Sequence, residues 1–228
     1  MDRGSWAPVG TSSEGERLES EVSPGWRAYV ERILDGLAQR GFAVVERAFP
    51  SGFLDELETE AREAWRGGDF RRAGVGRGGE SLPEVRTDHI LWLDPAAPTA
   101  LQARYLRDLD HLRLEIRRQL FLPVDQVEAH FAVYPPGAFY RRHLDRFQRM
   151  PHRLVSCLLY LNRGWRVEDG GQLRLYHPGP DGAEISLDVA PEHGTFVCFL
   201  SDRIEHEVFP TARPRASLAA WLRTRRLL

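Results

Sequence analysis

The sequence predicts an α+β fold, mainly β, in which N-terminal helices buttress a jelly-roll core. Two observations predict this fold. Apolar residues recur at helical spacing through much of the first 120 residues, and short apolar runs separated by turns fill the rest. Helices followed by runs of strands are typical of α+β proteins, and many short strands favour a barrel or a jelly roll.

The helical half begins with a predicted helix over residues 25–40, where apolar side chains stand at helical spacing. Gly41 follows this helix, and a glycine in that position commonly ends a helix. We expect Ser51 to cap a second helix. The sequence also predicts strands at 42–46 and 87–94 and a long amphipathic helix at 99–120.

The second half alternates short apolar runs with turn sequences such as PPG, EDGG and HPGPDG. These runs predict strands at residues 127–135, 153–162, 171–177, 184–190, 194–201 and 216–224. We therefore expect one domain over residues 25–228, with helical support at 25–120 and a jelly-roll core at 127–225. The polar tail 1–24 is expected to be disordered, and the glycine- and arginine-rich stretch 67–81 to form a mobile loop.

Composition and charge exclude several classes of protein. The chain has 228 residues and no apolar run near the roughly 20 residues that a membrane helix needs. Its N-terminus lacks the apolar stretch of a secretion signal, so we expect a cytoplasmic protein without a membrane partner. A net charge of -2 gives no reason to expect nucleic acid. All 31 basic residues are arginine, which indicates a bacterial genome rich in G and C. We expect Cys157 and Cys198 to be buried, reduced thiols.

Three residues of the second half have the pattern of a metal site. His143 and Asp145 are two residues apart, and positions i and i+2 of a strand point to the same face. His206, which follows an apolar strand, is the candidate for a third ligand. Two histidines and one carboxylate leave coordination positions open, which suits Fe(II) that must bind a co-substrate and O₂. Taken alone, a His-x-Asp pair is common by chance and is more often a simple hydrogen-bonded or exposed pair.

Two further residues strengthen the metal interpretation. Arg215 follows His206 by nine residues, and an arginine binds a carboxylate, such as the far end of 2-oxoglutarate, through two parallel hydrogen bonds. Tyr160 lies on a predicted strand from which its hydroxyl can donate to the same carboxylate. A surface ion pair is the alternative for Arg215 alone, so the combination carries the argument.

The order of these motifs resembles a known family. The segments YRRHLD, RLVSCLLYLNRGW, GGQLRLY and SDRIEHEVFPTARPRASLAAW are similar to the prolyl hydroxylases of the EGL-nine (SM-20-like) type. Upstream, GFAVVERAF and RTDHILWLD resemble segments of the same family, although Thr87 replaces the glycine of its R-G-D sequence. The resemblance covers about residues 28–225. It implies a double-stranded β-helix core and an Fe(II)- and 2-oxoglutarate-dependent dioxygenase, with ascorbate as a further possible cofactor.

The resemblance also implies roles for individual residues. His143, Asp145 and His206 match the iron ligands, and Arg215 and Tyr160 match the residues that bind the distal carboxylate of 2-oxoglutarate. The other matching positions are Tyr134 near the iron, the apolar lining residues Leu158, Leu173, Val208 and Trp221, and Arg153 and Arg86 at the substrate entrance. Core packing is the alternative for Trp221 and the leucines. His130 is an additional candidate for the pocket wall, whereas His89, His111, His152, His177 and His193 are expected to be structural or exposed.

The expected reaction is hydroxylation of an unactivated C–H bond. By resemblance, the substrate is a prolyl residue in a protein, as in bacterial relatives that hydroxylate elongation factor Tu, with O₂ as the second partner. Two alternatives stay open: hydroxylation of a free amino acid or a peptide natural product, and a non-catalytic metal-binding sensor. The core sequence does not separate the substrates, and the oligomeric state is left open.

Overall fold

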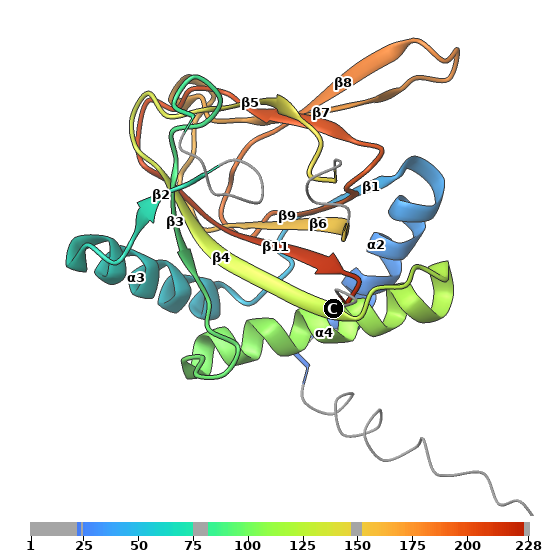
Figure 1. Ribbon diagram of the computed structural model, residues 1–228, viewed down its shortest axis with the longest axis horizontal. Coiled ribbons are helices and arrows are strands. Elements are labelled where there is room, and N and C mark those ends of the chain that lie inside the picture. Colours follow the sequence, from blue (N-terminus) through green and yellow to red (C-terminus); the bar gives the residue numbers. More distant parts are fainter. Residues whose placement is uncertain (1–21, 24, 75–81, 147–151, 226–228) are drawn as a thin grey trace, which may run out of the picture.

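In the described part of the chain, two antiparallel sheets and three main helices make up the fold (Figure 1). The computed structural model describes residues 22–23, 25–74, 82–146 and 152–225. The predicted disordered tail therefore lies almost wholly outside the described residues, as does the stretch 75–81 of the predicted mobile loop. Within the described part of the chain, no helix is long and apolar enough to cross a membrane.

The helices form close to where the sequence predicts them. They are α2 (Trp26–Arg40), α3 (Ser51–Gly67) and α4 (Ala100–Leu120), with a short 3-10 turn at Val167–Asp169. Gly41 ends α2 with φ 79°, and its N–H donates to the carbonyl of Leu37, as predicted. The prediction for Ser51 was wrong, because Pro50 is the N-cap and makes no side-chain hydrogen bond. The Ser51 hydroxyl instead accepts a hydrogen bond from Arg163 at 2.7 Å.

The strands form a major and a minor sheet, and every pairing within them is antiparallel. The order in the major sheet is β1 (Phe42–Val45), β9 (Phe196–Leu200), β6 (Arg153–Tyr160), β11 (Arg215–Arg223), β4 (Gln126–Tyr134), β3 (His89–Trp92) and β2 (Arg71–Arg72). The order in the minor sheet is β5 (Tyr140–His143), β10 (Glu205–Val208), β7 (Leu173–Pro178) and β8 (Glu184–Val189). Facing antiparallel sheets of this kind form the predicted jelly-roll core.

Three strands were absent from the predicted strand ranges: β2, β5 and β10, although the argument for His143 and Asp145 assumed a strand at the position of β5. Each has only two or four residues and carries polar or charged side chains, so none gives the apolar run by which strands are recognised. β2 occupies Arg71–Arg72, inside the stretch predicted as a mobile loop, and pairs with β3. Partners elsewhere in the chain, rather than local sequence, define these strands.

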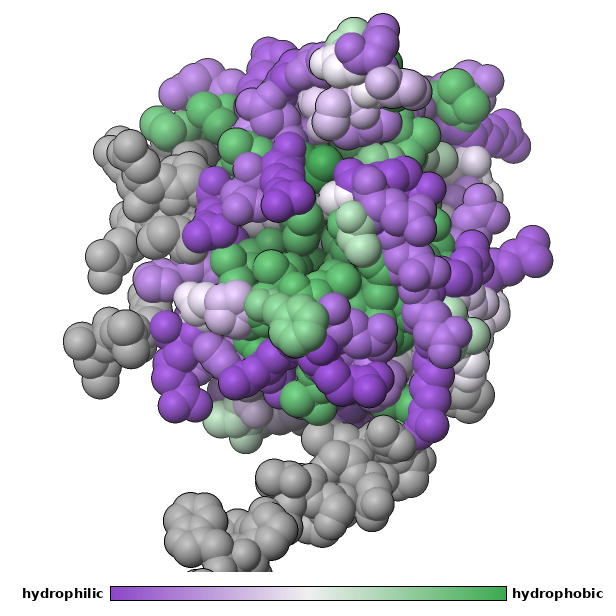
Figure 2. Space-filling view, turned by 90° about the vertical axis from the view of Figure 1, so that its right-hand side faces the viewer, coloured by the Kyte–Doolittle hydropathy of each residue, from purple (hydrophilic) through white to green (hydrophobic). Residues whose placement is uncertain are grey.

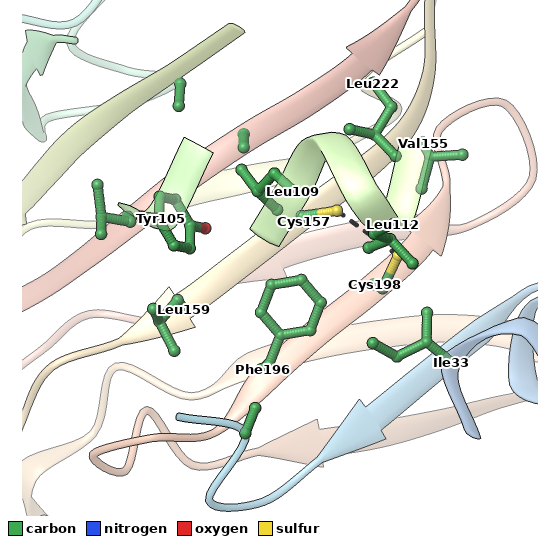
Figure 3. Packing of buried hydrophobic residues seen from close by; sticks show 14 of the residues in the cluster. Ile33, Tyr105, Leu109, Leu112, Val155, Cys157, Leu159, Phe196, Cys198 and Leu222 are labelled. Carbon is green, nitrogen blue, oxygen red and sulfur yellow. Dashed lines mark hydrogen bonds between the residues drawn. The ribbon is translucent and has the colours of Figure 1, made fainter. Parts of the chain in front are cut away.

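Buried side chains separate into two clusters on the two faces of the major sheet. The larger cluster lies between the helices and the outer face. Figure 3 shows a part of it, in which Tyr105 and Leu109 of α4 lie close to Phe196 and to the paired Cys157 and Cys198. The two thiols are free, buried and 3.6 Å apart, as predicted for reduced cysteines. The smaller cluster lies between the two sheets, around the candidate site.

Side chains of the central strands alternate between these clusters. On β11, Leu218 and Leu222 face the helices, whereas Arg215 and Trp221 line a pocket on the inner side. The period of two in a strand causes this alternation. One face of each central strand is therefore anchored to the helices while the other supplies the pocket.

Candidate active site

His143, Asp145 and His206 come together at one end of the pocket. His143 is the last residue of β5 and lies opposite His206 of β10 in the register of the minor sheet. The two imidazole ring centroids are 4.2 Å apart, and one ligand atom from each of the three residues lies within 4.8 Å of the others. These are the distances expected of side chains that share one metal ion.

The strand argument used for His143 and Asp145 was wrong in one respect. β5 ends at His143, and Asp145 lies in a bend beyond it, so alternation along a strand does not set its direction. Side chains of the major sheet hold Asp145 instead. The Ser156 hydroxyl donates to Oδ2 at 2.6 Å, the Trp221 indole Nε1 donates to the same oxygen at 2.9 Å, and Ser201 hydrogen-bonds to Ser156 at 2.8 Å.

Backbone carbonyls orient the two histidines. Nδ1 of His143 lies 2.6 Å from the carbonyl oxygen of Arg141, and Nδ1 of His206 lies 3.2 Å from that of Ile204. A carbonyl oxygen only accepts, so each Nδ1 carries the proton in the neutral ring and each Nε2 has a free lone pair. This tautomer is the one in which Nε2 binds a metal. Nε2 of His143 is buried and has no hydrogen-bond partner in the described part of the chain.

The charge states also suit a cation. Burial alone would raise the pKa of Asp145, but the imidazoles of His206 and His143 hold that pKa well below its ordinary value. Burial, with a smaller contribution from His143, lowers the pKa of His206 to about 4. At neutral pH the group therefore offers a carboxylate and neutral imidazole, the forms in which these side chains bind metals.

Arg215 and Tyr160 lie at the other end of the pocket. Arg215 is fully buried, and its Nε donates to the carbonyl of Gly171 at 2.9 Å, but neither Nη1 nor Nη2 has a partner among the described residues. The Tyr160 hydroxyl is equally buried, and no described residue hydrogen-bonds to it. The guanidinium carbon lies 4.8 Å from the ring centroids of both Tyr134 and Tyr160. A buried guanidinium with two free nitrogens beside a free hydroxyl fits a carboxylate.

Most of the predicted residues meet in this one pocket. Its lining includes His143, Asp145, His206, Arg215, Tyr134, Leu158, Leu173, Val208, Trp221, Arg86 and also His130. Tyr160 packs beside Arg215 in the inner cluster. Arg153 lies next to the pocket, with its guanidinium 3.4 Å from the ring centroid of Trp221 and its Nε donating to Glu128 at 2.9 Å. The individual roles of these residues stay predictions.

Arg86 lines the pocket, and its role at the substrate entrance stays a prediction. It is mostly buried, and its Nε and Nη2 donate to Asp88 at 2.7 and 2.6 Å. Burial alone would lower the pKa of Arg86, but the Asp88 carboxylate raises it above the ordinary value. The guanidinium also lies 4.2 Å from the ring centroid of Tyr140. It therefore forms a wall of the pocket.

Sequence reasoning missed Tyr140 and Ser156. The Tyr140 ring stacks on His143 with centroids 3.6 Å apart, and burial raises its pKa to about 12, so the phenol is neutral. Ser156 holds Asp145. Period-two alternation from Tyr160 through Leu158 would have placed Ser156 on the pocket face. Nothing local to Tyr140 marks it, because its strand was not predicted.

Comparisons with known proteins agree with this geometry. The sequence model of the 2OG-Fe(II) oxygenase superfamily matches residues 129–223, which contain all three residues of the metal group. A prolyl-4-hydroxylase from Pseudomonas putida is 42% identical in sequence over 86% of this chain and 100% of its own, with a TM-score of 0.76 between the structures. The chain belongs to the prolyl hydroxylases of the 2OG-Fe(II) oxygenase superfamily.

Two further relatives are similar to this prolyl hydroxylase in fold or in sequence. A prolyl hydroxylase from Trichoplax adhaerens, solved with a peptide fragment of the hypoxia inducible factor oxygen degradation domain, shares the fold with a TM-score of 0.76 at 24% identity, over 93% of both chains. The human Egl nine homolog 1 is 27% identical over 89% of this chain and 48% of its own length. The chain thus spans about half the length of that relative. Fe(II) and 2-oxoglutarate are the metal and the co-substrate of the superfamily, and the residues described above fit both.

Proposed function

We propose that the protein hydroxylates a prolyl residue in a protein, using Fe(II), 2-oxoglutarate and O₂. One observation carries the proposal: a metal-binding group of His143, Asp145 and His206 shares a pocket with two buried guanidinium nitrogens of Arg215, Nη1 and Nη2, that no described residue pairs. A metal-binding protein that is only a sensor does not need a second, carboxylate-binding end. An oxygenase that consumes 2-oxoglutarate does.

The residues have distinct tasks in this proposal. His143, Asp145 and His206 would hold Fe(II), and Arg215 with Tyr160 would hold the distal carboxylate of the co-substrate. Bound Fe(II) and 2-oxoglutarate together supply the oxidising chemistry, in which 2-oxoglutarate becomes succinate and CO₂ while one oxygen atom enters the substrate. Asp145 is fixed by Ser156 and Trp221 before any ion binds, so little reorganisation accompanies binding.

The pocket walls keep water away from the reacting centre. Tyr140 covers one side of His143, and Phe199 packs against His206 with ring centroids 4.6 Å apart. Leu173 and Val208 are buried beside them. Such a wall strengthens the interaction of Arg215 with a carboxylate, because ionic hydrogen bonds are stronger away from water.

The substrate class rests on the relatives. The Pseudomonas putida relative is named a prolyl-4-hydroxylase, and it is similar over its whole length. The resemblance of the motifs to bacterial members makes elongation factor Tu the first protein to test. The free amino acid proline and acetylated prolyl peptides serve as the alternative substrates.

The test measures succinate formation and substrate oxidation together. Wild-type protein, Arg215→Met and a control Arg174→Met receive Fe(II), 2-oxoglutarate, O₂ and elongation factor Tu. We expect wild type and the control to form succinate and to add one oxygen atom, about 16 Da, to a proline, and Arg215→Met to do neither. Arg174 lies on β7 and pairs with Asp188 on the outer side of the minor sheet, so its loss leaves the pocket intact.

Each other outcome has a definite meaning. Succinate formation without a modified protein, but with hydroxylated free proline, would replace the protein substrate by a small one. Absence of succinate with every substrate, although a metal ion binds, would overturn the enzymatic proposal in favour of a sensor. Equal activity of Arg215→Met and wild type would contradict the assignment of the carboxylate-binding end.

A further inference from the structure

His130 is a polar residue in the pocket wall that neither the metal group nor the carboxylate-binding end uses. It lies on β4 four residues before Tyr134, on the same face of the strand, and it lines the pocket while only 3% exposed. Tyr134 sits beside Arg215, at the carboxylate-binding end. His130 therefore lies further along the wall, next to Trp221, with ring centroids 5.3 Å apart.

The ring of His130 is held in one orientation. Its Nδ1 lies 3.0 Å from the carbonyl oxygen of Phe131. Trp92 meets it nearly at right angles with centroids 4.9 Å apart, and the ring packs obliquely on Trp221. Trp221 is itself fixed by its hydrogen bond to Asp145. The imidazole is thus part of a rigid wall that begins at the metal group and ends at the half-exposed Trp92.

The surroundings of His130 determine its charge and which ring nitrogen carries the proton. Burial lowers the pKa of His130 to about 4, helped by the charge of Arg86, so the ring is neutral near pH 7. A neutral imidazole has one N–H and one lone pair, and the Phe131 carbonyl requires the N–H on Nδ1. The lone pair is therefore on Nε2. No residue in the described ranges hydrogen-bonds to that nitrogen, which is not sealed from solvent and can therefore be reached from the pocket that His130 lines.

A hydrogen-bond acceptor that is held in one orientation at the surface of the pocket is available to a donor group of a bound ligand, and such a bond stabilises the complex. An apolar ring would otherwise fill this position between two tryptophans. Resting on the function proposed above, we infer that His130 is a substrate-binding residue whose Nε2 accepts a hydrogen bond from a backbone N–H of the polypeptide substrate. The prolyl nitrogen carries no hydrogen, so the donor is the amide of a neighbouring residue.

The experiment separates the acceptor from the ring. His130→Phe keeps an aromatic side chain and removes the acceptor, and His130→Gln returns an oxygen near the position of Nε2. His177→Phe is the control, since His177 lies on β7 against Phe42, outside the pocket. Steady-state kinetics use elongation factor Tu or, if it is not a substrate, the acetylated prolyl peptides. Thermal unfolding verifies that each variant is folded.

We expect His130→Phe to raise KM for the polypeptide about 5- to 10-fold, the effect of one neutral hydrogen bond, with kcat within about twofold. His130→Gln should recover part of the loss, and both variants should bind 2-oxoglutarate as wild type does. Methylation of the peptide amides one at a time should weaken wild type at one position and leave His130→Phe unaffected there.

The two proposals fail in different ways. If wild type hydroxylates the polypeptide and His130→Phe has an unchanged KM, the inference about His130 is wrong and the proposed function stands. If free proline is the substrate that wild type hydroxylates, or if nothing is hydroxylated, the proposed function falls and this inference falls with it. A loss of 2-oxoglutarate binding in His130→Phe would show a structural effect on the pocket and would also contradict the inference.

Discussion

The indole nitrogen of Trp221 donates a hydrogen bond to Oδ2 of Asp145 over 2.9 Å. Trp221 belongs to β11 of the major sheet, whereas Asp145 follows β5 of the minor sheet. Ser156 of β6 donates to the same oxygen, so both of these donors use Oδ2, while Oδ1 faces Nε2 of His143 at 3.7 Å. One carboxylate therefore joins the two sheets at the point where the metal group forms.

This arrangement predicts that Trp221→Phe and Ser156→Ala weaken metal binding. Each substitution removes one of the donors that fix Asp145, and loss of such a partner typically lowers metal affinity about 10- to 100-fold. Titration of the metal-free protein with Mn(II), which O₂ does not oxidise under these conditions, measures the metal affinity. Trp65→Phe is the matched control, because Trp65 is partly exposed on α3. Unchanged affinity in both variants would show that Asp145 holds its position without them.

Arg215 predicts a ligand-dependent change in thermal stability. A co-substrate at 100 times its Kd stabilises the folded state by about 2.7 kcal/mol. For a domain of this size, each 1 kcal/mol raises Tm by roughly 2–4 °C. With Mn(II) present throughout, we expect 2-oxoglutarate to raise the Tm of wild type and of Arg174→Met by this amount above the value with Mn(II) alone, and to leave the Tm of Arg215→Met at its value with Mn(II) alone.

Without ligand, Arg215→Met should be as stable as wild type or more stable. A buried guanidinium with no ion-pair partner is costly, and an apolar side chain of similar length avoids that cost. A large loss of stability in ligand-free Arg215→Met would mean that the arginine mainly supports the fold. Differential scanning calorimetry of wild type, Arg174→Met and Arg215→Met, each without ligand, with Mn(II) and with Mn(II) plus 2-oxoglutarate, measures both effects.

His130 predicts a pH dependence of stability. Its pKa is about 4 in the folded protein and about 6.5 when unfolded, so the unfolded chain binds the proton more readily. The contribution of neutral His130 to the free energy of unfolding is therefore complete above pH 6.5 and is lost as the pH falls toward 4. Arg86 and Arg153 oppose protonation of the ring, and Asp88 favours it. The full difference is on the order of 3 kcal/mol.

Urea unfolding of wild type and His130→Phe between pH 7.5 and pH 4 measures this dependence. The free energy of unfolding of wild type should fall relative to that of His130→Phe as the pH decreases, because phenylalanine cannot titrate. A constant difference between the two proteins would mean that His130 keeps its ordinary pKa and is protonated in the folded state at pH 5. In that case Nε2 would be a donor at acidic pH.

The close packing around Gly36 predicts that alanine at this position destabilises the protein, although alanine has the higher helix propensity. Gly36 lies inside α2, where alanine is ordinarily favoured over glycine by about 1 kcal/mol. A Cβ at this position would lie 2.7 Å from Cβ of Ala43 and 2.8 Å from the carbonyl oxygen of Phe42. We expect Gly36→Ala to destabilise the protein by about 1–3 kcal/mol, because α2 must move away from β1. Gly52→Ala on α3, where nothing lies within 4 Å, should be neutral or stabilising in the same urea experiment.

The long helices and the apolar strands could be predicted from the sequence, because their buried residues form apolar patterns along the chain. Ser51 shows where local reasoning stops: its hydroxyl has a partner 112 residues away, and no local pattern reveals that competition. β5 and β10 were missed for the same reason, since each is defined by its neighbours in the sheet.

The site, too, could be predicted only in part. His143, Asp145, His206 and Arg215 were predicted from residue type and spacing, and the structure brings them into one pocket. What holds them could not be predicted, because Ser156 lies 11 residues from Asp145 and Trp221 lies 76 residues away. Trp221 was assigned an apolar lining role, and its indole N–H gives it a polar one as well.

Because side chains alternate along β11, the same strand supplies residues to the pocket and to the core. Arg215, Ser217, Ala219 and Trp221 face the pocket, and the residues between them belong to the core under the helices. Deleting a single residue early in this strand would turn every later side chain to the opposite face. Trp221 would then point at α4 and Leu222 at Asp145. Evolution can therefore exchange pocket residues one at a time, but it cannot change the length of this strand without rebuilding the protein.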